Sequence, residues 1–364
     1  MVRPAEMEVV LALVLRLGID TFESGYRINP STLSHSEKEG CMMLMRKLRE
    51  KFLTDASPTR DALMAQLSHL YDALQCYPAD TVLDECEVAL SKSWASKFGG
   101  FGDCWEGIFL GSHKVAMKCP RGAFTEAGTR RLLREMRVWS RLHHPNVLPF
   151  LGWHQSRSVT YLVSPWMENG QVLEFLQSYP EADSLRLLVQ VASGLEYLHT
   201  FQPPVIHGDL RGPNILISQL GNACIADFGL SELKAEGYEN YSTPWFSAGH
   251  PRWQAPELIR AETNEEARRT VASDVFSFGR VMLEVFTTKP PFFYIDHNLA
   301  VAKRVEAGEF PNRPHDTTVA RGLDDTMWGM MTDCWDVIPS RRPSATNIVS
   351  RLHAAVEGRV PQVE

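Results

Sequence analysis

The chain lacks the features that mark secreted, membrane-spanning and nucleic-acid-binding proteins. Its seven cysteines are scattered singly, with no Cys-x-x-Cys pair, which argues against a zinc site or a disulfide framework and for a reducing compartment such as the cytoplasm. The apolar run at residues 9–17 is far shorter than the ~20 residues that cross a bilayer, and it lacks the basic start of a signal peptide. A net charge of −7 predicts no general attraction to nucleic acid or to anionic membranes.

Repeats and low-complexity tracts are absent as well, and 364 residues are enough for two or three compact units. Within the first 87 residues, apolar side chains at positions 42–53 recur at helical spacing. A second helix is expected to begin at Ser57-Pro58, a capping residue followed by proline at the first helical position. Residues 25–40 are polar and predict a loop, and residues 76–87 predict a connector into a strand that begins near residue 88.

A leucine stripe marks the second expected helix, at Leu63, Leu67, Leu70 and Leu74. Such a stripe must be buried against something. The favoured interpretation is a small helical cap packed on the rest of the chain. The alternative is a helix that binds a regulatory partner or a second copy.

The strongest chemical signal is a carboxylate, an amide and a second carboxylate around a predicted hairpin. Short strands are expected near residues 215–217 and 224–226, with turn residues between them. Folding that hairpin brings Asp209, Asn214 and Asp227 to one side. Asn214 and Asp227 suit a hard, oxygen-preferring cation such as Mg²⁺, and Asp209 can hold a substrate hydroxyl.

The motifs around these residues resemble the catalytic and metal-binding loops of protein kinases. Further kinase-like segments come in the same order, and the resemblance covers residues 88–356. It is closest to the tyrosine-kinase-like family, especially the expanded kinases of mushroom-forming fungi. The segments that carry it are His207-Gly208-Asp209-Leu210-Arg211-Gly212-Pro213-Asn214, Asp227-Phe228-Gly229, Val115-Ala116-Met117-Lys118, Ala255-Pro256-Glu257, Ser273-Asp274-Val275-Phe276-Ser277-Phe278-Gly279 and, for the narrower assignment, residues 139–152.

The resemblance implies an α+β, two-lobed protein kinase fold at residues 88–358, preceded by a helical segment at residues 1–87. It implies ATP and Mg²⁺ as cofactors and transfer of the γ-phosphoryl group to protein hydroxyls, on serine or threonine more than on tyrosine. A catalytically weak pseudokinase scaffold is the alternative. A small-molecule kinase is disfavoured, because residues 255–257 and the helix expected after them build a platform for a polypeptide.

The same resemblance assigns roles to individual residues. Lys118 orients the ATP phosphates, Glu135 in an expected helix at residues 129–142 holds Lys118, and Asp209 positions or deprotonates the acceptor. Arg211 neutralises the moving phosphoryl group, while Asn214 and Asp227 bind Mg²⁺. The nucleotide is expected to contact Gly99, Gly100, Gly102, Cys104, Ala116, Lys118, Pro165 and Met167.

The chain departs from the kinase pattern at four positions. Lys97 replaces the first glycine of the phosphate-covering loop, and Cys104 replaces the valine over adenine. Gly208 stands where many kinases place an arginine that pairs with a phosphate on the activation loop, so activity should not depend on phosphorylation of the activation loop. His250 replaces a threonine whose hydroxyl bonds the catalytic aspartate, a bond that an imidazole could still donate to Asp209.

Three structural expectations complete the picture. His207 is expected to pack under Phe228 in the core and to transfer no proton. The resemblance implies a buried ion pair between Arg342 and Glu257. The charge-rich residues 260–270 are expected to form a solvated loop, with a docking surface as the alternative.

Overall fold

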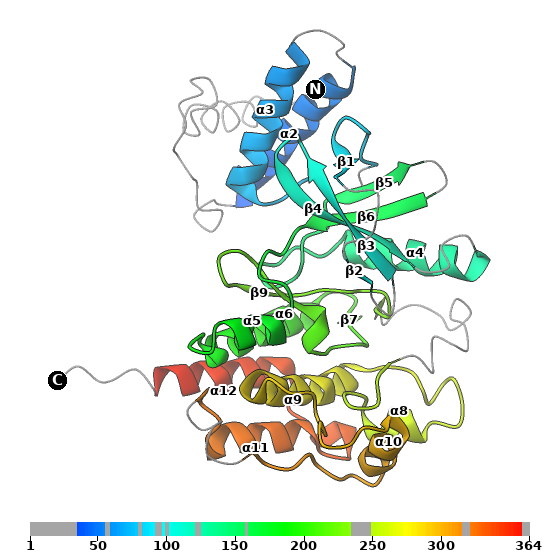
Figure 1. Ribbon diagram of the computed structural model, residues 1–364, viewed down its shortest axis with the longest axis vertical. Helices are drawn as coiled ribbons and strands as arrows, with labels where there is room; N and C mark the ends of the chain where they lie inside the picture. Colours follow the sequence, from blue (N-terminus) through cyan, green and yellow to red (C-terminus); the bar gives the residue numbers. More distant parts are fainter. Residues whose placement is uncertain are drawn as a thin grey trace, which may run out of the picture. The chain divides into compact units, whose positions relative to one another are not determined.

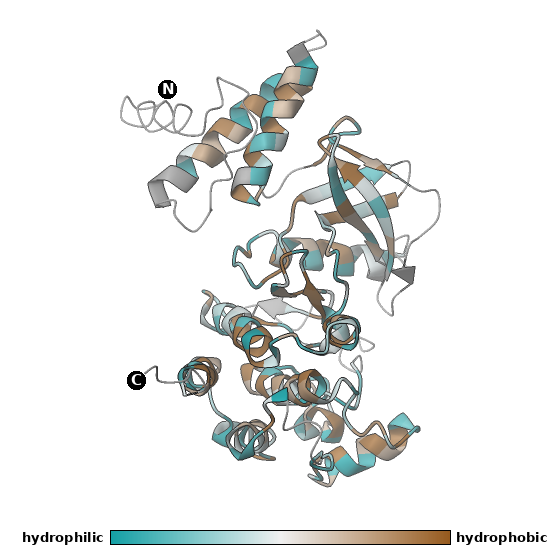
Figure 2. Cartoon of the chain, turned by 60° about the vertical axis from the view of Figure 1, so that its left-hand side comes forward, coloured by the Kyte–Doolittle hydropathy of each residue, from teal (hydrophilic) through white to brown (hydrophobic). Residues whose placement is uncertain are grey.

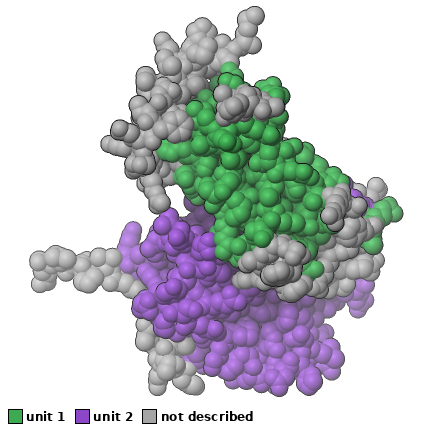
Figure 3. All heavy atoms as spheres, turned by 45° about the horizontal axis from the view of Figure 1, so that its top comes forward, with its two compact units in different colours: residues 1–128, 149–166 green, residues 129–148, 167–364 purple. Residues whose placement is uncertain are grey.

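The computed structural model describes residues 35–54, 59–78, 82–91, 97–98, 102–120, 125–156, 159–233, 249–314 and 321–358. The chain divides into two compact units, which Figure 3 colours separately. The first unit comprises residues 1–128 and 149–166, and the second comprises residues 129–148 and 167–364.

An antiparallel sheet of six strands is the framework of the first unit (Figure 1). Its strands are β1 (Val88–Leu90), β2 (Lys97–Phe98), β3 (Gly102–Phe109), β4 (His113–Pro120), β5 (Gly152–Ser156) and β6 (Val159–Pro165). The order is β1-β3-β4-β6-β5, and β2 pairs with β3. Strand β4 therefore lies in the interior of the sheet, with Lys118 opposite Cys104 of β3 and Leu162 of β6.

Two helices, α2 (His35–Thr54) and α3 (Thr59–Leu74), share one hydrophobic core with this sheet. All four leucines of the stripe are buried, in a cluster that also contains Phe109 of β3 and Met117 of β4. The ring of Tyr71 in α3 stands edge-on to that of Phe109, with 5.4 Å between the centroids. The favoured interpretation is confirmed, because the stripe packs against the sheet as a helical cap.

The predicted loop at residues 25–40 is wrong from His35 onward, where α2 has already begun. The reason is that Cys41 and Met45 are both fully buried on one face of the helix, so burial extends the helix into a polar stretch. Figure 2 shows hydrophobic and hydrophilic residues mixed along both helices. The rest of the predicted loop, the apolar run at residues 9–17 and the expected helix start at Ser57-Pro58 lie outside the described residues.

Alternation along β4 separates the cap side of the sheet from the opposite side. Val115 and Met117 are fully buried in the core shared with the cap. Since successive strand residues point to opposite faces, Ala116 and Lys118 belong to the other face. The cap therefore supports the strand that carries Lys118 from behind, without covering that lysine's face.

A buried carboxylate joins the cap to the start of the sheet. Glu87, which is 1% exposed, accepts two hydrogen bonds from Arg49 of α2, with Nε at 2.6 Å from Oε1 and Nη2 at 2.7 Å from Oε2. The hydroxyl of Tyr77 donates to Oε1 at 2.8 Å, and the backbone amide of Asp84 donates to Oε2 at 2.8 Å. Because Val88 begins β1, this cluster fixes the cap to the edge of the sheet.

Helices and two short two-stranded sheets build the second unit (Figure 1). Helix α6 packs against α9 and α12, and α9 also packs against α11, so α6 and α9 form the buried centre. The elements are α4 (Glu126–Trp139, from Thr129 on), α5 (Val172–Ser178), α6 (Ser184–Thr200), β7 (Val205–Ile206), η2 (Gly212–Asn214), β8 (Ile215–Ile217), β9 (Ala223–Ile225), β10 (Glu232–Leu233), α8 (Pro256–Arg260), α9 (Val271–Thr287), α10 (Asn298–Glu306), α11 (Asp325–Cys334), η5 (Pro339–Arg341) and α12 (Ala345–Glu357).

Helix α4 lies three residues earlier than the predicted helix at residues 129–142. It ends at Trp139 because the next amides turn back by three residues, Arg141 to the carbonyl of Val138 and Leu142 to that of Trp139. The indole of Trp139 also donates to the carbonyl of Leu148 at 2.6 Å, which holds the departing chain against the helix.

Two predictions about charged residues have opposite outcomes. The ion pair between Arg342 and Glu257 is confirmed, with two parallel hydrogen bonds of 2.7 Å. The predicted solvated loop at residues 260–270 is wrong at Arg269, which is 2% exposed. Its stem lies against the backbone of Gly208, where the glycine leaves room for it. Among the helices that the structure describes, none combines the length and apolar character needed to span a membrane.

We call the cluster of Glu87, Arg49, Tyr77 and the amide of Asp84 the latch, and it leads to a prediction about stability. Arg49→Met removes both charge-assisted hydrogen bonds and leaves a carboxylate buried without its cation, which should destabilise the protein by about 3 kcal/mol. Chemical denaturation measures the change. The matched control is Arg46→Met on an exposed position of the same helix, which should change stability by less than about 0.5 kcal/mol. Equal effects of the two substitutions would contradict the latch.

Candidate active site

The loop between β7 and β8, residues 207–214, carries most of the predicted catalytic groups in the second unit, and we name it the catalytic loop for that prediction. Strands β8 and β9 pair with Ile215 opposite Ile225, which confirms the predicted hairpin with a one-residue shift in the second strand. Just beyond this pairing, the amide of Ala226 donates to the carbonyl of Asn214 at 2.8 Å. The hairpin therefore brings Asn214 and the start of the Asp227 segment to the same end.

Asp209 is held by two neighbours. Its Oδ2 accepts from Nε of Arg211 at 3.1 Å and from Nδ2 of Asn214 at 3.0 Å. Burial raises the pKa of Asp209; the charge of Arg211 opposes that shift and the carboxylate of Asp227 adds to it. The like charges of Asp209 and Asp227 favour a cation between them. Asn214 and Asp227 offer oxygen ligands of the kind that Mg²⁺ prefers.

His207 is a core residue, as predicted. It is fully buried, and its ring lies 5.4 Å from that of Phe228 in an edge-on arrangement. Nδ1 accepts from the backbone amide of Asp209 at 3.2 Å, and Nε2 lies 3.0 Å from the carbonyl of Ala226. The tautomer with its proton on Nε2 satisfies both bonds, so this ring fixes backbone and has no nitrogen left for proton transfer.

Asp274 fixes the same loop from α9. This carboxylate is 1% exposed and accepts from the backbone amides of His207 at 2.7 Å and Gly208 at 2.9 Å. Its Oδ2 also lies 3.2 Å from Nε2 of His199. Burial opposes ionisation, but the hydrogen bond and charge of His199 and the bond from Gly208 outweigh it and lower the pKa of Asp274. The sequence places Asp274 in one of the kinase-like segments but gives no sign of these bonds.

Glu284 is a second buried carboxyl that the sequence did not single out. Its Oε2 accepts from the indole of Trp253 at 2.6 Å and from the amide of Gly212 at 2.8 Å, so it ties α9 to the catalytic loop and to the chain before α8. A Cβ at position 212 would lie 2.9 Å from Oε1, which explains the glycine there. Burial raises the pKa of Glu284 to about 8.

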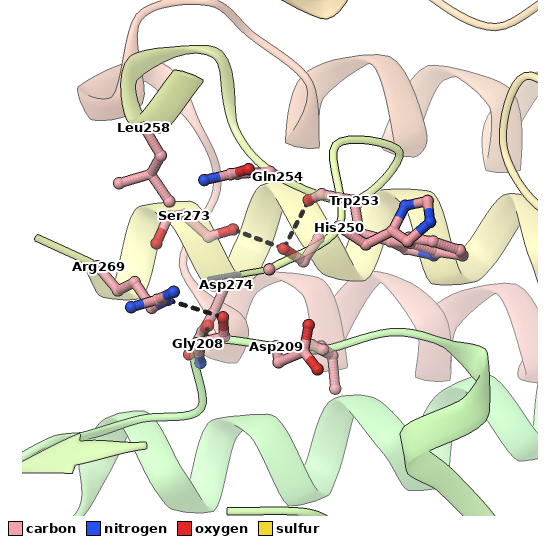
Figure 4. Close-up of a pocket in the computed structure, with 12 residues that line it drawn as sticks. Gly208, Asp209, His250, Trp253, Gln254, Leu258, Arg269, Ser273 and Asp274 are labelled. Carbon is pink, nitrogen blue, oxygen red and sulfur yellow. Dashed lines mark hydrogen bonds between the residues drawn. The ribbon is translucent and has the colours of Figure 1, made fainter. Parts of the chain in front are cut away.

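A pocket opens beside the loop, and Figure 4 shows its lining. Asp209 lines it from one side, and His250 and Trp253 line it from the other. The predicted bond from His250 to Asp209 is not among the interactions of the described residues. Instead Nδ1 of His250 accepts from the amide of Arg252, and burial, followed by the charges of Arg211 and Arg252, lowers the pKa of His250 to about 4. The imidazole is therefore neutral and turned to its own chain.

The predicted nucleotide residues of the first unit lie on neighbouring strands. Lys118 and Ala116 share the face of β4 opposite the cap, and Cys104 of the adjacent strand β3 is paired with Lys118. Pro165 ends β6, paired with Val115, and Gly102 begins β3. Gly99 and Gly100 lie outside the described residues.

In the second unit, the side chains of Glu135 and Asp227 both lie close to Gly229. Glu135 is 1% exposed in α4, and a Cβ added at Gly229 would lie 3.3 Å from its Oε2 and 3.2 Å from Oδ1 of Asp227. Asp227 has a left-handed φ of 66°, a costly conformation for a non-glycine residue that is characteristic of functional sites. Met167 belongs to the same unit, and its carbonyl accepts from the amide of Gly170 at 3.0 Å.

Comparison with known proteins gives one consistent family. Residues 97–352 match the model described as protein tyrosine and serine/threonine kinase. The serine/threonine-protein kinase CTR1 of Arabidopsis thaliana is 30% identical over 269 residues, which is 72% of this chain and 31% of that protein. Mitogen-activated protein kinase kinase kinase 7 of Drosophila melanogaster is 32% identical over 64% of this chain and 33% of its own length.

A third relative, the probable serine/threonine-protein kinase drkC of Dictyostelium discoideum, is 30% identical over 70% of this chain and 32% of its own length. The chain thus spans about a third of the length of these relatives. The names of CTR1 and drkC specify serine/threonine-protein kinases, and the third name specifies a mitogen-activated protein kinase kinase kinase.

The raised pKa of Glu284 generates a pH prediction. A carboxyl with a folded pKa of about 8 and an ordinary unfolded value loses stabilisation as pH rises between those two values. Glu284→Gln keeps an oxygen that can accept from Trp253 and Gly212 but cannot ionise. The variant should therefore gain stability relative to the wild type between pH 5 and 8, by up to about 1.4 kcal/mol per pH unit. Denaturation curves at several pH values measure it; a constant difference would contradict the assignment.

Proposed function

Because the chain belongs to the protein tyrosine and serine/threonine kinase family, we propose that it transfers the γ-phosphoryl group of ATP to protein hydroxyls, mainly on serine and threonine. The observation that carries the proposal is the carboxylate of Asp209, held at 3.1 Å by Arg211 and at 3.0 Å by Asn214 beside a pocket. Such a carboxylate can orient a hydroxyl and accept its proton.

The other predicted residues are proposed to act as follows. Lys118 grips the ATP phosphates as a compact positive charge, and Glu135 holds Lys118 in place. Arg211, already bonded to Asp209, offsets charge on the moving phosphoryl group. Asn214 and Asp227 would hold Mg²⁺, which when bound neutralises phosphate charge. Because Nδ2 of Asn214 is engaged by Asp209, its amide oxygen is the atom available to a cation.

Serine or threonine preference is supported by the names of the relatives, CTR1 and drkC among them. Membership of the tyrosine-kinase-like group, near the expanded kinases of mushroom-forming fungi, is the finer proposal. We also propose protein substrates and a cytoplasmic location; all seven cysteines lie among the described residues as thiols, as in a reducing compartment. We also propose a division of the chain into a helical segment, residues 1–87, and a kinase domain, residues 88–358, although helices of the first share one core with strands of the second.

A pseudokinase scaffold is not favoured. The departures that would support it are Lys97 and Gly208, but around Gly208 the amides of residues 207 and 208 donate to Asp274 and the amide of Asp209 donates to His207. All six residues proposed for chemistry are present: Lys118, Glu135, Asp209, Arg211, Asn214 and Asp227.

The proposal predicts the loss of phosphotransfer from two substitutions. Asp209→Asn and Lys118→Met should each lower the rate of peptide phosphorylation by at least about 100-fold, because each removes a group proposed to act on the reacting atoms. The assay uses purified protein, Mg²⁺, radiolabelled ATP and a mixed peptide pool. A variant that retains near wild-type turnover with an intact melting transition would refute its assigned role.

The acceptor type has a separate readout. Phosphoamino-acid analysis of the labelled peptides should find most label on serine and threonine. Label mainly on tyrosine would reverse the preference and would identify Arg211, which is bonded to Asp209, and His250, which lines the pocket, as the residues to exchange next.

A further inference from the structure

Gly208 and Arg269 occupy one space. Gly208, directly before Asp209, has a left-handed φ of 79°. A Cβ at this position would lie 2.5 Å from Cδ of Arg269 and 2.9 Å from the carbonyl oxygen of Leu230. Real Cβ atoms do not approach so closely, so a side chain at position 208 and the stem of Arg269 exclude each other. The arginine that many kinases place at 208 could not coexist with Arg269 here.

The guanidinium of Arg269 is bonded to the catalytic loop. The residue is 2% exposed, and its Nε donates to the carbonyl oxygen of Gly208 at 2.9 Å, a bond visible in Figure 4. A hydrogen bond from an ionised donor is roughly twice as strong as a neutral one. Arg269 stands just before α9, whose Asp274 binds the amide of the same glycine at 2.9 Å.

These bonds fix the peptide plane that leads into Asp209. The carbonyl of that plane belongs to Gly208 and is held by Arg269, and its N–H belongs to Asp209 and donates to Nδ1 of His207 at 3.2 Å. A planar peptide held at both polar ends cannot rotate about the chain axis. The direction in which the Asp209 side chain leaves the backbone is therefore set from both sides.

We propose that Arg269 is a positioning residue for Asp209, which orders the catalytic loop in place of an arginine at position 208. The proposal rests on the proposed kinase activity and extends it to regulation. Because Arg269 is bonded to the loop's own backbone, the orientation of Asp209 does not require a phosphate on the chain between Asp227 and Ala255. The unphosphorylated protein is therefore competent for phosphotransfer.

Substitution of Arg269 separates its hydrogen bond from its bulk. Gln places a nitrogen donor where Nε of arginine stands, whereas Met fills a similar volume without a donor. Arg269→Met should lower kcat by about 10- to 100-fold, as expected for a misplaced catalytic group, with the KM for ATP within about twofold. Arg269→Gln should stay within about threefold of the wild-type kcat, because the bond to Gly208 is retained.

The control is Arg304→Met, which removes an exposed arginine paired with Glu309 on the surface and should leave kcat unchanged. All proteins are full-length, phosphatase-treated and checked by the amplitude of the melting transition. Wild-type kcat in Arg269→Met would overturn the proposal, as would a loss in Arg269→Gln as large as in Arg269→Met. If Arg269→Met does not melt cooperatively, Arg269→Gln decides: retained kcat supports the proposal, and loss of kcat or of folding contradicts it.

The wild type provides the second arm. Phosphatase treatment, verified by mass spectrometry, should lower its rate by less than about threefold, since no phosphate is needed to order the loop. A drop of tenfold or more would overturn the proposal and point to a different basic residue that reads a phosphate. Absence of any wild-type phosphotransfer would instead reject the proposed function, so the two failures are distinguishable.

Discussion

The carboxylate of Asp274 is the constraint on which the candidate site depends. It lies in the first turn of α9, where the helix dipole favours a negative charge, and it accepts two consecutive amides of the catalytic loop. Without these bonds the two amides would lose their partners, and the buried carboxylate would keep only His199. Helix α9 therefore supports the loop directly: the same helix carries Glu284, which binds Gly212 at the loop's far end. One rigid helix thus holds both ends of the segment that presents Asp209.

A similar principle organises the first unit. Glu87 gathers Arg49 of the cap, Tyr77 of the connector and the backbone before β1 around one buried charge. The apolar stripe of α3 supplies the burial energy, but hydrophobic contacts do not fix a helix at one position on a sheet as firmly as directional bonds do. The latch supplies that direction. The consequence for function is that the strand carrying Lys118 is backed by a core reaching into α2 and α3, so the helices are part of the unit that holds it.

The sequence predicted well the contacts that the kinase-like motifs imply, and poorly the contacts made by residues outside those motifs. The hairpin at β8 and β9 follows from its strand and turn residues, whereas the core role of His207 and the ion pair of Arg342 with Glu257 follow from the resemblance to kinases. The loop predicted at residues 25–40 was wrong at its end because tertiary burial of Cys41 and Met45 overrides a polar composition. The role of Glu284 could not be predicted, since a glutamate in an apolar helix gives no sign of which distant amides it meets.

Gly208 shows why motif departures are hard to interpret in isolation. Along the chain, a glycine in place of an arginine is a loss of charge and suggests inactivity. In space, the glycine leaves the room that admits Arg269, a residue 61 positions later in a stretch that looked like a solvated charge run. Arg269 thus places a positive charge beside the catalytic loop from a different position in the sequence. The departure therefore carries less weight against activity than the motif alone suggests, because the backbone before Asp209 is held by Arg269, the residue for which we propose a positioning role.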